Sequence, residues 1–173
     1  PLLTPPTSLA ITNATLNGKF LFNSSKPDSV AFKGTLELPA GFNLVNAHDC
    51  WVGLSGVTDK VSVSPSGKAA SHGLKGLLKA FKIAYPRRTM LATTGQTAVI
   101  SFTLYGPNLS ARGFAASGIA PQLRPDEGGQ DATLRYIQAA IVLDTTAYSG
   151  LIPVEFALSK TKVSATIKPL SNR

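Results

Sequence analysis

His48, Asp49 and Cys50 are the adjacent residues of this 173-residue chain whose types could do chemistry together. A Cys–His pair makes a nucleophile only when the two side chains are in hydrogen-bond contact. On a strand, His48 and Cys50 share one face but lie about 6.6 Å apart along it. No Gly-rich oxyanion loop follows them. We therefore expect no catalytic site here and a chain that is not an enzyme.

Metal binding is a second hypothesis for the same residues. His48, Cys50 and His72 offer imidazole and thiolate groups, which suit copper or zinc. The competing interpretation is a histidine near a strand end and a small buried thiol. A single cysteine excludes an internal disulfide framework, although a crosslink between chains through Cys50 is a further alternative. We expect no metal and no other cofactor.

Carboxylates gather in one segment, at residues 121–131 (PQLRPDEGGQD). Asp126, Glu127 and Asp131 could offer calcium the oxygen ligands it prefers, but their spacing is not that of an EF-hand. We interpret the segment as an exposed loop. The sequence also contains no P-loop, dinucleotide-binding or nucleophile-elbow motif.

Aromatic side chains suggest a binding role as an alternative. Sugars stack on exposed aromatic rings, and the candidates are Trp51, Tyr85, Tyr105, Tyr136 and Tyr148. Packing in the core and on strand surfaces is the competing interpretation. Discriminating the two requires knowing which rings share one exposed face.

The elements that must position these residues are strands. Val30, Phe32, Gly34, Leu36 and Leu38 alternate with polar residues, which predicts a strand with one face in a core. Similar patterns predict strands over residues 9–23 (kinked near Asn13), 44–54, 60–64, 77–85, 98–104, 134–143, 152–158 and 163–167, the last as an edge strand. The segment 77–85 also matches a helical spacing.

Short connections complete the expected fold. Asn108 or Ser110 can cap a short helix over residues 109–117 with Gly118 as its stop, and residues 144–150 read as a hairpin loop. Eight to ten strands with one or two short helices predict an all-β antiparallel β-sandwich, Ig-like or jelly-roll-like, with Greek-key connections. We expect an extended Pro-rich arm over residues 1–8 and a single sandwich domain over 9–173.

The N-terminal segment could build an assembly. An extended, partly apolar segment can add a strand to a neighbour's sheet edge, and exposed edges otherwise invite aggregation. The residues that would make this contact are Leu2, Leu3, Leu9, Ile11, Leu16, Phe20 and Phe22. The equally supported alternative is a first strand of the chain's own sheet.

Charge and composition limit the partners. The net charge is +8 while charged residues make up only 15 %, so an anionic glycan or surface is a further partner class. The basic residues are scattered, with no basic arm or aromatic-interleaved face, so we expect no nucleic acid; this also disfavours a jelly-roll capsid protein. The chain contains no run of about 18 apolar residues, so we expect no membrane span. Three glycosylation sequons begin at Asn13, Asn23 and Asn108.

Three stretches resemble bacterial extracellular β-sandwich domains found in large surface proteins. They are residues 28–42 (DSVAFKGTLELPAGF), 56–69 (GVTDKVSVSPSGKA) and 132–150 (ATLRYIQAAIVLDTTAYSG). The resemblance implies a secreted or surface-displayed sandwich and carries over no site residue. We expect an extracellular structural subunit that associates with copies of itself into a filament or surface layer, with N-terminal donor-strand complementation as one route. The alternative is a carbohydrate- or surface-binding, adhesin-type module.

Overall fold

The chain folds almost entirely into β-strands. The computed structural model describes residues 8–22, 24–42, 48–69, 76–84, 95–121 and 133–170. The elements are β1 (Leu9–Ala10), β2 (Thr12–Leu21), β3 (Asp28–Leu38), β4 (His48–Leu54), β5 (Val57–Val63), β6 (Leu78–Ala84), β7 (Gln96–Gly106), α1 (Leu109–Arg112), the 3-10 turn η1 (Phe114–Ser117), β8 (Thr133–Leu143), β9 (Thr146–Leu158) and β10 (Ser164–Pro169).

All ten strands belong to one sheet, in the order β5-β4-β8-β9-β10-β2-β3-β7-β6, with β1 added against β9. Every neighbouring pair is antiparallel except β1 and β9. A bridge between Lys68 and Lys82 brings the β5 end of the sheet to β6, and the Ile83 amide donates to the Gly67 carbonyl at 2.7 Å. The all-β prediction is confirmed. The predicted sandwich of two separate packed sheets is not confirmed, because the strands form one nearly closed, barrel-like sheet.

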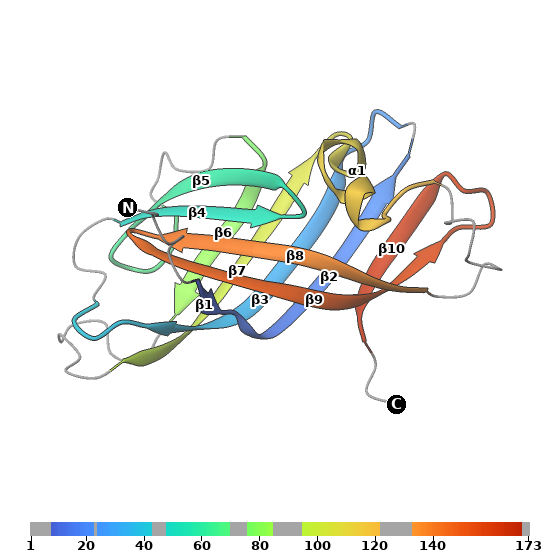
Figure 1. Cartoon of the computed structure of the whole chain (residues 1–173). Coiled ribbons are helices and arrows are strands. Elements are labelled where there is room, and N and C mark those ends of the chain that lie inside the picture. Colours follow the sequence, from blue (N-terminus) through green and yellow to red (C-terminus); the bar gives the residue numbers. More distant parts are fainter. Residues whose placement is uncertain are drawn as a thin grey trace, which may run out of the picture.

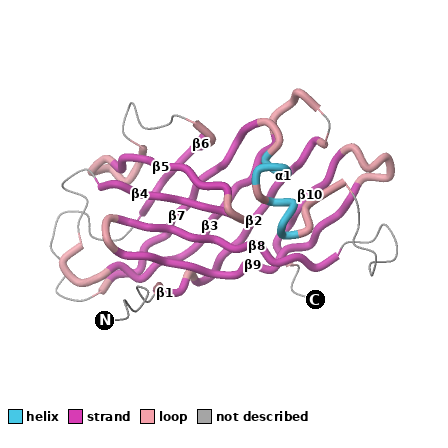
Figure 2. Tube along the Cα trace, turned by 45° about the horizontal axis from the view of Figure 1, so that its top comes forward, coloured by secondary structure: helices cyan, strands magenta, loops and turns pink. Residues whose placement is uncertain are grey.

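The curled sheet has two walls. In Figure 1, β4, β5, β8 and β9 lie in front of β2, β3, β6 and β7 and cross them at an angle. Figure 2 shows the same crossing from a turned view, with α1 beside the end of β10. The inward side chains of both walls therefore meet in one core, and each wall has its own outer face.

Alternation along the strands fills that core, as the sequence predicts. In β3, residues from Val30 to Leu38 alternate between buried and outward positions, and Phe32 stacks on Phe102 of β7 with ring centroids 4.7 Å apart. In β6 the alternation is interrupted because the pairing with β7 shifts between Leu78 and Ala80. This bulge turns Leu78 inward, while Leu77 before it is only partly buried. The pairing of β6 with β7 excludes the helical alternative.

The N-terminal strands lie within the chain's own sheet. β1 runs parallel to β9, and the Ile11 amide donates to the Ser149 carbonyl at 3.0 Å. The pairing of β2 with β3 then shifts between Thr12 and Thr15, at Asn13, whose φ of 47° is left-handed. The predicted kink near Asn13 is confirmed. Ile11 itself packs over Gly34 and Gly150, where any Cβ would crowd it.

Three local predictions are wrong. The last strand, β10, is not an edge strand because β9 and β2 flank it. The connection after β8 is not a loop over residues 144–150: β9 already begins at Thr146, and a tight turn with Asp144 at φ 52° suffices. The helix over residues 109–117 is divided at Gly113, which lies too close to the Ser55 carbonyl for any Cβ.

The two helical turns pack into one end of the sheet. Leu109 and Phe114 are fully buried, and the Phe114 ring lies 5.2 Å from that of Phe20. Asn108 precedes α1 in a left-handed conformation but makes no side-chain cap, while Gly118 ends the 3-10 turn at φ 83° as predicted. In the described part of the chain, no helix is long and apolar enough to cross a membrane.

Candidate functional site

Cys50 lies in the core and not in a reactive site. It is 0 % exposed, facing inward from β4. Burial, with a smaller contribution from the Asp144 carboxylate, raises the pKa of its thiol from 9.0 to about 12. A thiol that stays protonated is a poor nucleophile and metal ligand. This placement supports the interpretation of Cys50 as a small buried hydrophobe.

The other candidate ligands are not brought to Cys50 in the described structure. His48 begins β4 with its backbone opposite Val63, its side chain is outside the described part, and His72 lies outside the described residues. Among the residues that are described, no group of three His, Cys, Asp or Glu side chains could hold a metal. The carboxylates Asp126, Glu127 and Asp131 also lie outside them.

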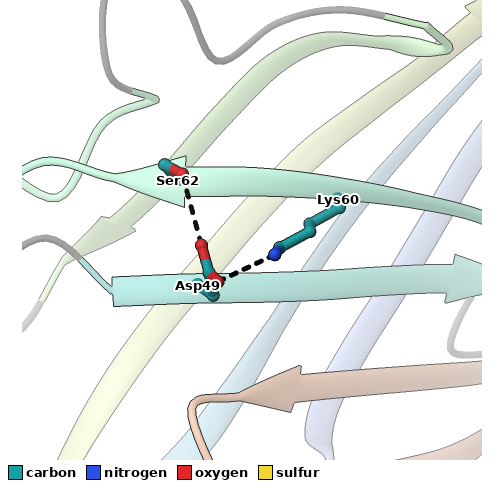
Figure 3. A network of polar contacts seen from close by, with 3 residues as sticks. All are labelled: Asp49, Lys60 and Ser62. Carbon is teal, nitrogen blue, oxygen red and sulfur yellow. Dashed lines mark hydrogen bonds and ion pairs between the residues drawn. The ribbon is translucent and has the colours of Figure 1, made fainter.

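Asp49 belongs to a small polar network on the outer face (Figure 3). Its Oδ2 lies 2.8 Å from Lys60 Nζ, and Ser62 Oγ donates to its Oδ1 at 3.3 Å. The hydrogen bond from Lys60 lowers the pKa of Asp49. Lys60 Nζ also lies 5.6 Å from the centre of the Trp51 ring. These groups are exposed, so the network orients Lys60 and Trp51 rather than activating a carboxylate.

The outer face of the front wall is strongly apolar. Its most exposed large apolar side chains are Leu151 at 69 %, Tyr136 at 56 % and Leu134 at 49 %, with Trp51 at 50 % near its other end. We call this surface the apolar face and define it as the outward residues of β8 and β9 together with Trp51: Trp51, Leu134, Tyr136, Gln138, Ala140, Val142, Ala147, Ser149, Leu151, Pro153 and Glu155. Glu155 is the only acidic or basic residue among them.

A hollow of about 280 Å³ opens on this face beside the 3-10 turn. Tyr136, Gln138 and Leu151 line one side, and Ser117 lines the other. Arg135 lies beneath it, 3 % exposed, and its Nε donates to the Gly118 carbonyl at 3.2 Å. The guanidinium also lies 5.1 Å from the Phe156 ring. Arg135 is thus held in the core and ties the 3-10 turn to β8.

The five aromatic candidates do not form one platform. Trp51 and Tyr136 share the apolar face, but Trp51 lies opposite Val142, about 20 Å along β8 from Tyr136 by the rise of a strand. Tyr148 is buried and donates to the Glu37 carbonyl at 3.0 Å. Tyr105 lies on the opposite wall under Lys79, and Tyr85 lies outside the described residues.

The candidate assembly residues take three different positions. Leu16 and Phe20 of β2 are fully buried, and Phe22 and Ile11 are nearly so. Leu9 is 43 % exposed in β1. Leu2 and Leu3 lie outside the described residues, as does the sequon residue Asn23. The other sequon residues, Asn13 and Asn108, are exposed.

Lysines gather on the other wall, which the sequence alone did not predict. The outward positions of β10, β2, β3, β7 and β6 carry exposed Lys19, Lys33, Lys79, Lys82 and Lys168, and one carboxylate, Glu37. The back wall therefore carries an excess of lysines, whereas on the front wall Lys60 is paired with Asp49. The alternation placed each lysine outward, but only the strand order shows that they share a surface.

The comparisons give no relative from which a role could be carried over. No protein-family model, no curated protein and no solved structure matches this chain. The candidate surfaces therefore stand on their own geometry: an apolar face on one wall and a lysine-bearing face on the other.

Proposed function

We propose that this chain is a non-enzymatic, extracellular structural subunit that associates with copies of itself through the apolar face. The observation that carries the proposal is the exposure of Leu134, Tyr136 and Leu151 together on the apolar face, where Glu155 is the only acidic or basic residue. Contiguous exposed apolar surface on a folded chain is typical of an interaction site.

A second copy is the occupant that the charge distribution favours. At a net charge of +8, two copies repel each other over most approaches. The apolar face is the surface on which they can meet with little like-charge contact, because five exposed lysines of the sheet lie on the opposite wall and Lys60, beside Trp51, is paired with Asp49. An apolar core with few charges is also what self-association interfaces prefer.

A filament or layer needs a second contact. Pairing through one self-complementary face closes as a dimer and cannot propagate. We propose the N-terminal arm for this contact, since β1 is only two residues long and ends at the kink near Asn13. Exchange would involve Leu9 and Ile11 with the residues before them. Leu16 and Phe20 stay in their own core, because β2 is flanked on both sides.

Electron microscopy and light scattering test this proposal with the chain and a variant lacking residues 1–11. We expect filaments or sheets from the full chain and folded, non-propagating particles from the truncated one. A peptide of residues 1–14 should bind the truncated chain and raise its Tm, because it restores Ile11 over Gly34 and Gly150. Monodisperse monomers from both proteins at high concentration would contradict the proposal.

A carbohydrate-binding module is the second candidate. The observation that favours it is the hollow beside Tyr136 and Gln138, which joins an aromatic ring to an amide on an exposed surface. A screen with neutral oligosaccharides distinguishes the two functions. Saturable binding that is lost in Tyr136→Ala, by a chain that stays monomeric, would favour this second function over assembly.

A further inference from the structure

One row of residues crosses the back wall of the sheet with three lysines in it. Lys33 of β3 lies opposite Ser101 of β7, and Ser101 lies opposite Lys82 of β6. Lys82 in turn lies opposite Lys68 at the bridge that nearly closes the sheet. All three lysines are exposed. Residues directly opposite each other on antiparallel strands point to the same side, so the three ammonium groups share one surface.

This row is electrostatically unfavourable without an anion. Like charges directly opposite on neighbouring strands are destabilising, and Lys68 and Lys82 are in that position. The row extends to Thr15 beyond Lys33 and contains no carboxylate. On the outer face of this wall the described carboxylate is Glu37, about 13 Å along β3 from Lys33, where it accepts from Thr97 Oγ1 at 2.8 Å.

A shallow trough lies beside the row. Its hollow of about 200 Å³ is lined by small side chains, Ala31, Ala80, Ser101 and Thr103, with Lys82 at its border. On the far side of these small residues lies the next row, which contains Lys19 and Tyr105. Lysines therefore border the trough on both sides, and hydroxyl groups lie along its floor. We call this surface the lysine trough.

We propose that the lysine trough binds an acidic polysaccharide. The carboxylate or sulfate groups of the chain would pair with Lys33, Lys82 and Lys68, which follow one another across the strands. Lys33 and Lys82 lie about 10 Å apart across β7, by the spacing of strands in a sheet. The hydroxyls of Ser101 and Thr103 would hydrogen-bond the sugar, and the small floor residues leave room for its rings.

Nucleic acid fits this surface less well. Single-stranded nucleic acid is held by aromatic side chains on which bases stack. The exposed ring of this wall, Tyr105, is covered by Lys79, whose Nζ lies 4.4 Å from the ring centre. The inference is independent of self-association, because the trough lies on β3, β6 and β7 and the apolar face on β8 and β9, and these strands belong to opposite walls (Figure 1). A pair of copies joined at the apolar face would present two troughs, which would strengthen binding to a polymer.

Binding of dextran sulfate and polygalacturonate, measured by calorimetry with uncharged dextran as reference, tests the proposal. The variant is Lys33→Gln/Lys68→Gln/Lys82→Gln. Its matched control is Lys26→Gln/Lys160→Gln/Lys162→Gln, which removes the same charge from exposed turns elsewhere. Loss of three exposed ion pairs should weaken binding about tenfold or more in the trough variant. The control should change it less than about threefold, which is the size of a general charge effect.

Three results would overturn the proposal. Equal weakening in the two triple variants would show attraction by net charge alone. No binding of either acidic polymer at low salt would show that the trough has no such ligand. Tighter binding of a single-stranded oligonucleotide than of both polysaccharides, at equal charge and salt, would assign the surface to nucleic acid. Each binding measurement uses variants whose Tm matches that of the parent chain.

Discussion

Replacing Cys50 with valine should remove a steep loss of stability at alkaline pH. The thiol is 0 % exposed, and burial raises its pKa from 9.0 to about 12 in the folded chain. Because the folded-state pKa is the higher one, the unfolded chain loses this proton first as the pH rises. Ionisation of Cys50 therefore does not change the free energy of unfolding below pH 9. It lowers this free energy between pH 9 and pH 12.

The size of the effect follows from the shift. At pH 10, one unit above the unfolded-state pKa, the linkage costs about 1.4 kcal/mol of the free energy of unfolding, and each further unit costs about the same until pH 12. Valine is close to cysteine in volume and cannot ionise, so the Cys50→Val chain should lack this loss. Tyrosines and lysines titrate in both chains, and the difference between the two chains cancels them.

Urea unfolding at several pH values between 7 and 10.5 measures that difference. The stability gap between the parent and Cys50→Val should change by about 1.4 kcal/mol from pH 8 to pH 10 in favour of valine. A gap that stays constant over this range would refute the reasoning, because it would mean that the thiol is solvated in the folded chain. Rapid labelling of the native thiol by a bulky reagent would lead to the same conclusion.

Three further substitutions test how the sheet is held together, each by chemical denaturation. Gly18→Ala places a Cβ 2.9 Å from Ile167 Cγ1 and should destabilise the chain by about 1–3 kcal/mol; an unchanged midpoint would mean that β10 does not pack there. Asp59 accepts from the amides of Leu77 and Leu78, where β6 begins, at 2.7 and 2.9 Å, so Asp59→Ala should cost about 1–3 kcal/mol; an unchanged stability would mean that Asp59 does not hold β5 and β6 together. Tyr148→Phe removes the bond to the Glu37 carbonyl and should cost about 1 kcal/mol, with no loss expected only if that bond is absent in solution.

The sequence was sufficient to predict most strands. Apolar residues at every second position locate β3 and the central part of β7, because a half-buried strand needs one apolar face. The same pattern predicts the inward residues of β8 and β9. It fails at β6, where a bulge changes which of Leu77 and Leu78 points inward.

The order of the strands could not be predicted from the sequence. Alternation with a period of two shows which side of the sheet a residue faces, but not which strand lies beside it. The lysine trough joins Lys33, Lys68 and Lys82, which look scattered along the chain and meet only when β3, β7 and β6 are neighbours. For the same reason the sequence predicts an edge strand at β10, which the structure places between β9 and β2. The sheet closure depends on that order as well.

The apolar face did leave a signal in the sequence. Residues 134–143 (LRYIQAAIVL) are apolar at outward as well as inward positions. Such a run is typical of a strand covered on both faces, yet in the folded chain the outward residues Leu134 and Tyr136 are about half exposed. A strand that is apolar on both faces, but whose outer face is exposed, is the most direct indication in the sequence that a partner covers this face.

Sedimentation velocity over a wide concentration range is the measurement that tests the apolar face most directly. The variant is Leu134→Lys/Leu151→Lys, and the control is Val163→Lys/Leu170→Lys, which adds the same charge at exposed apolar residues outside the apolar face. We predict concentration-dependent association of the parent and the control, and much weaker association of the Leu134→Lys/Leu151→Lys variant, which keeps only the proposed contact through the N-terminal arm. A parent chain that stays monomeric at every concentration, or a face variant that associates as the parent does, would contradict the account.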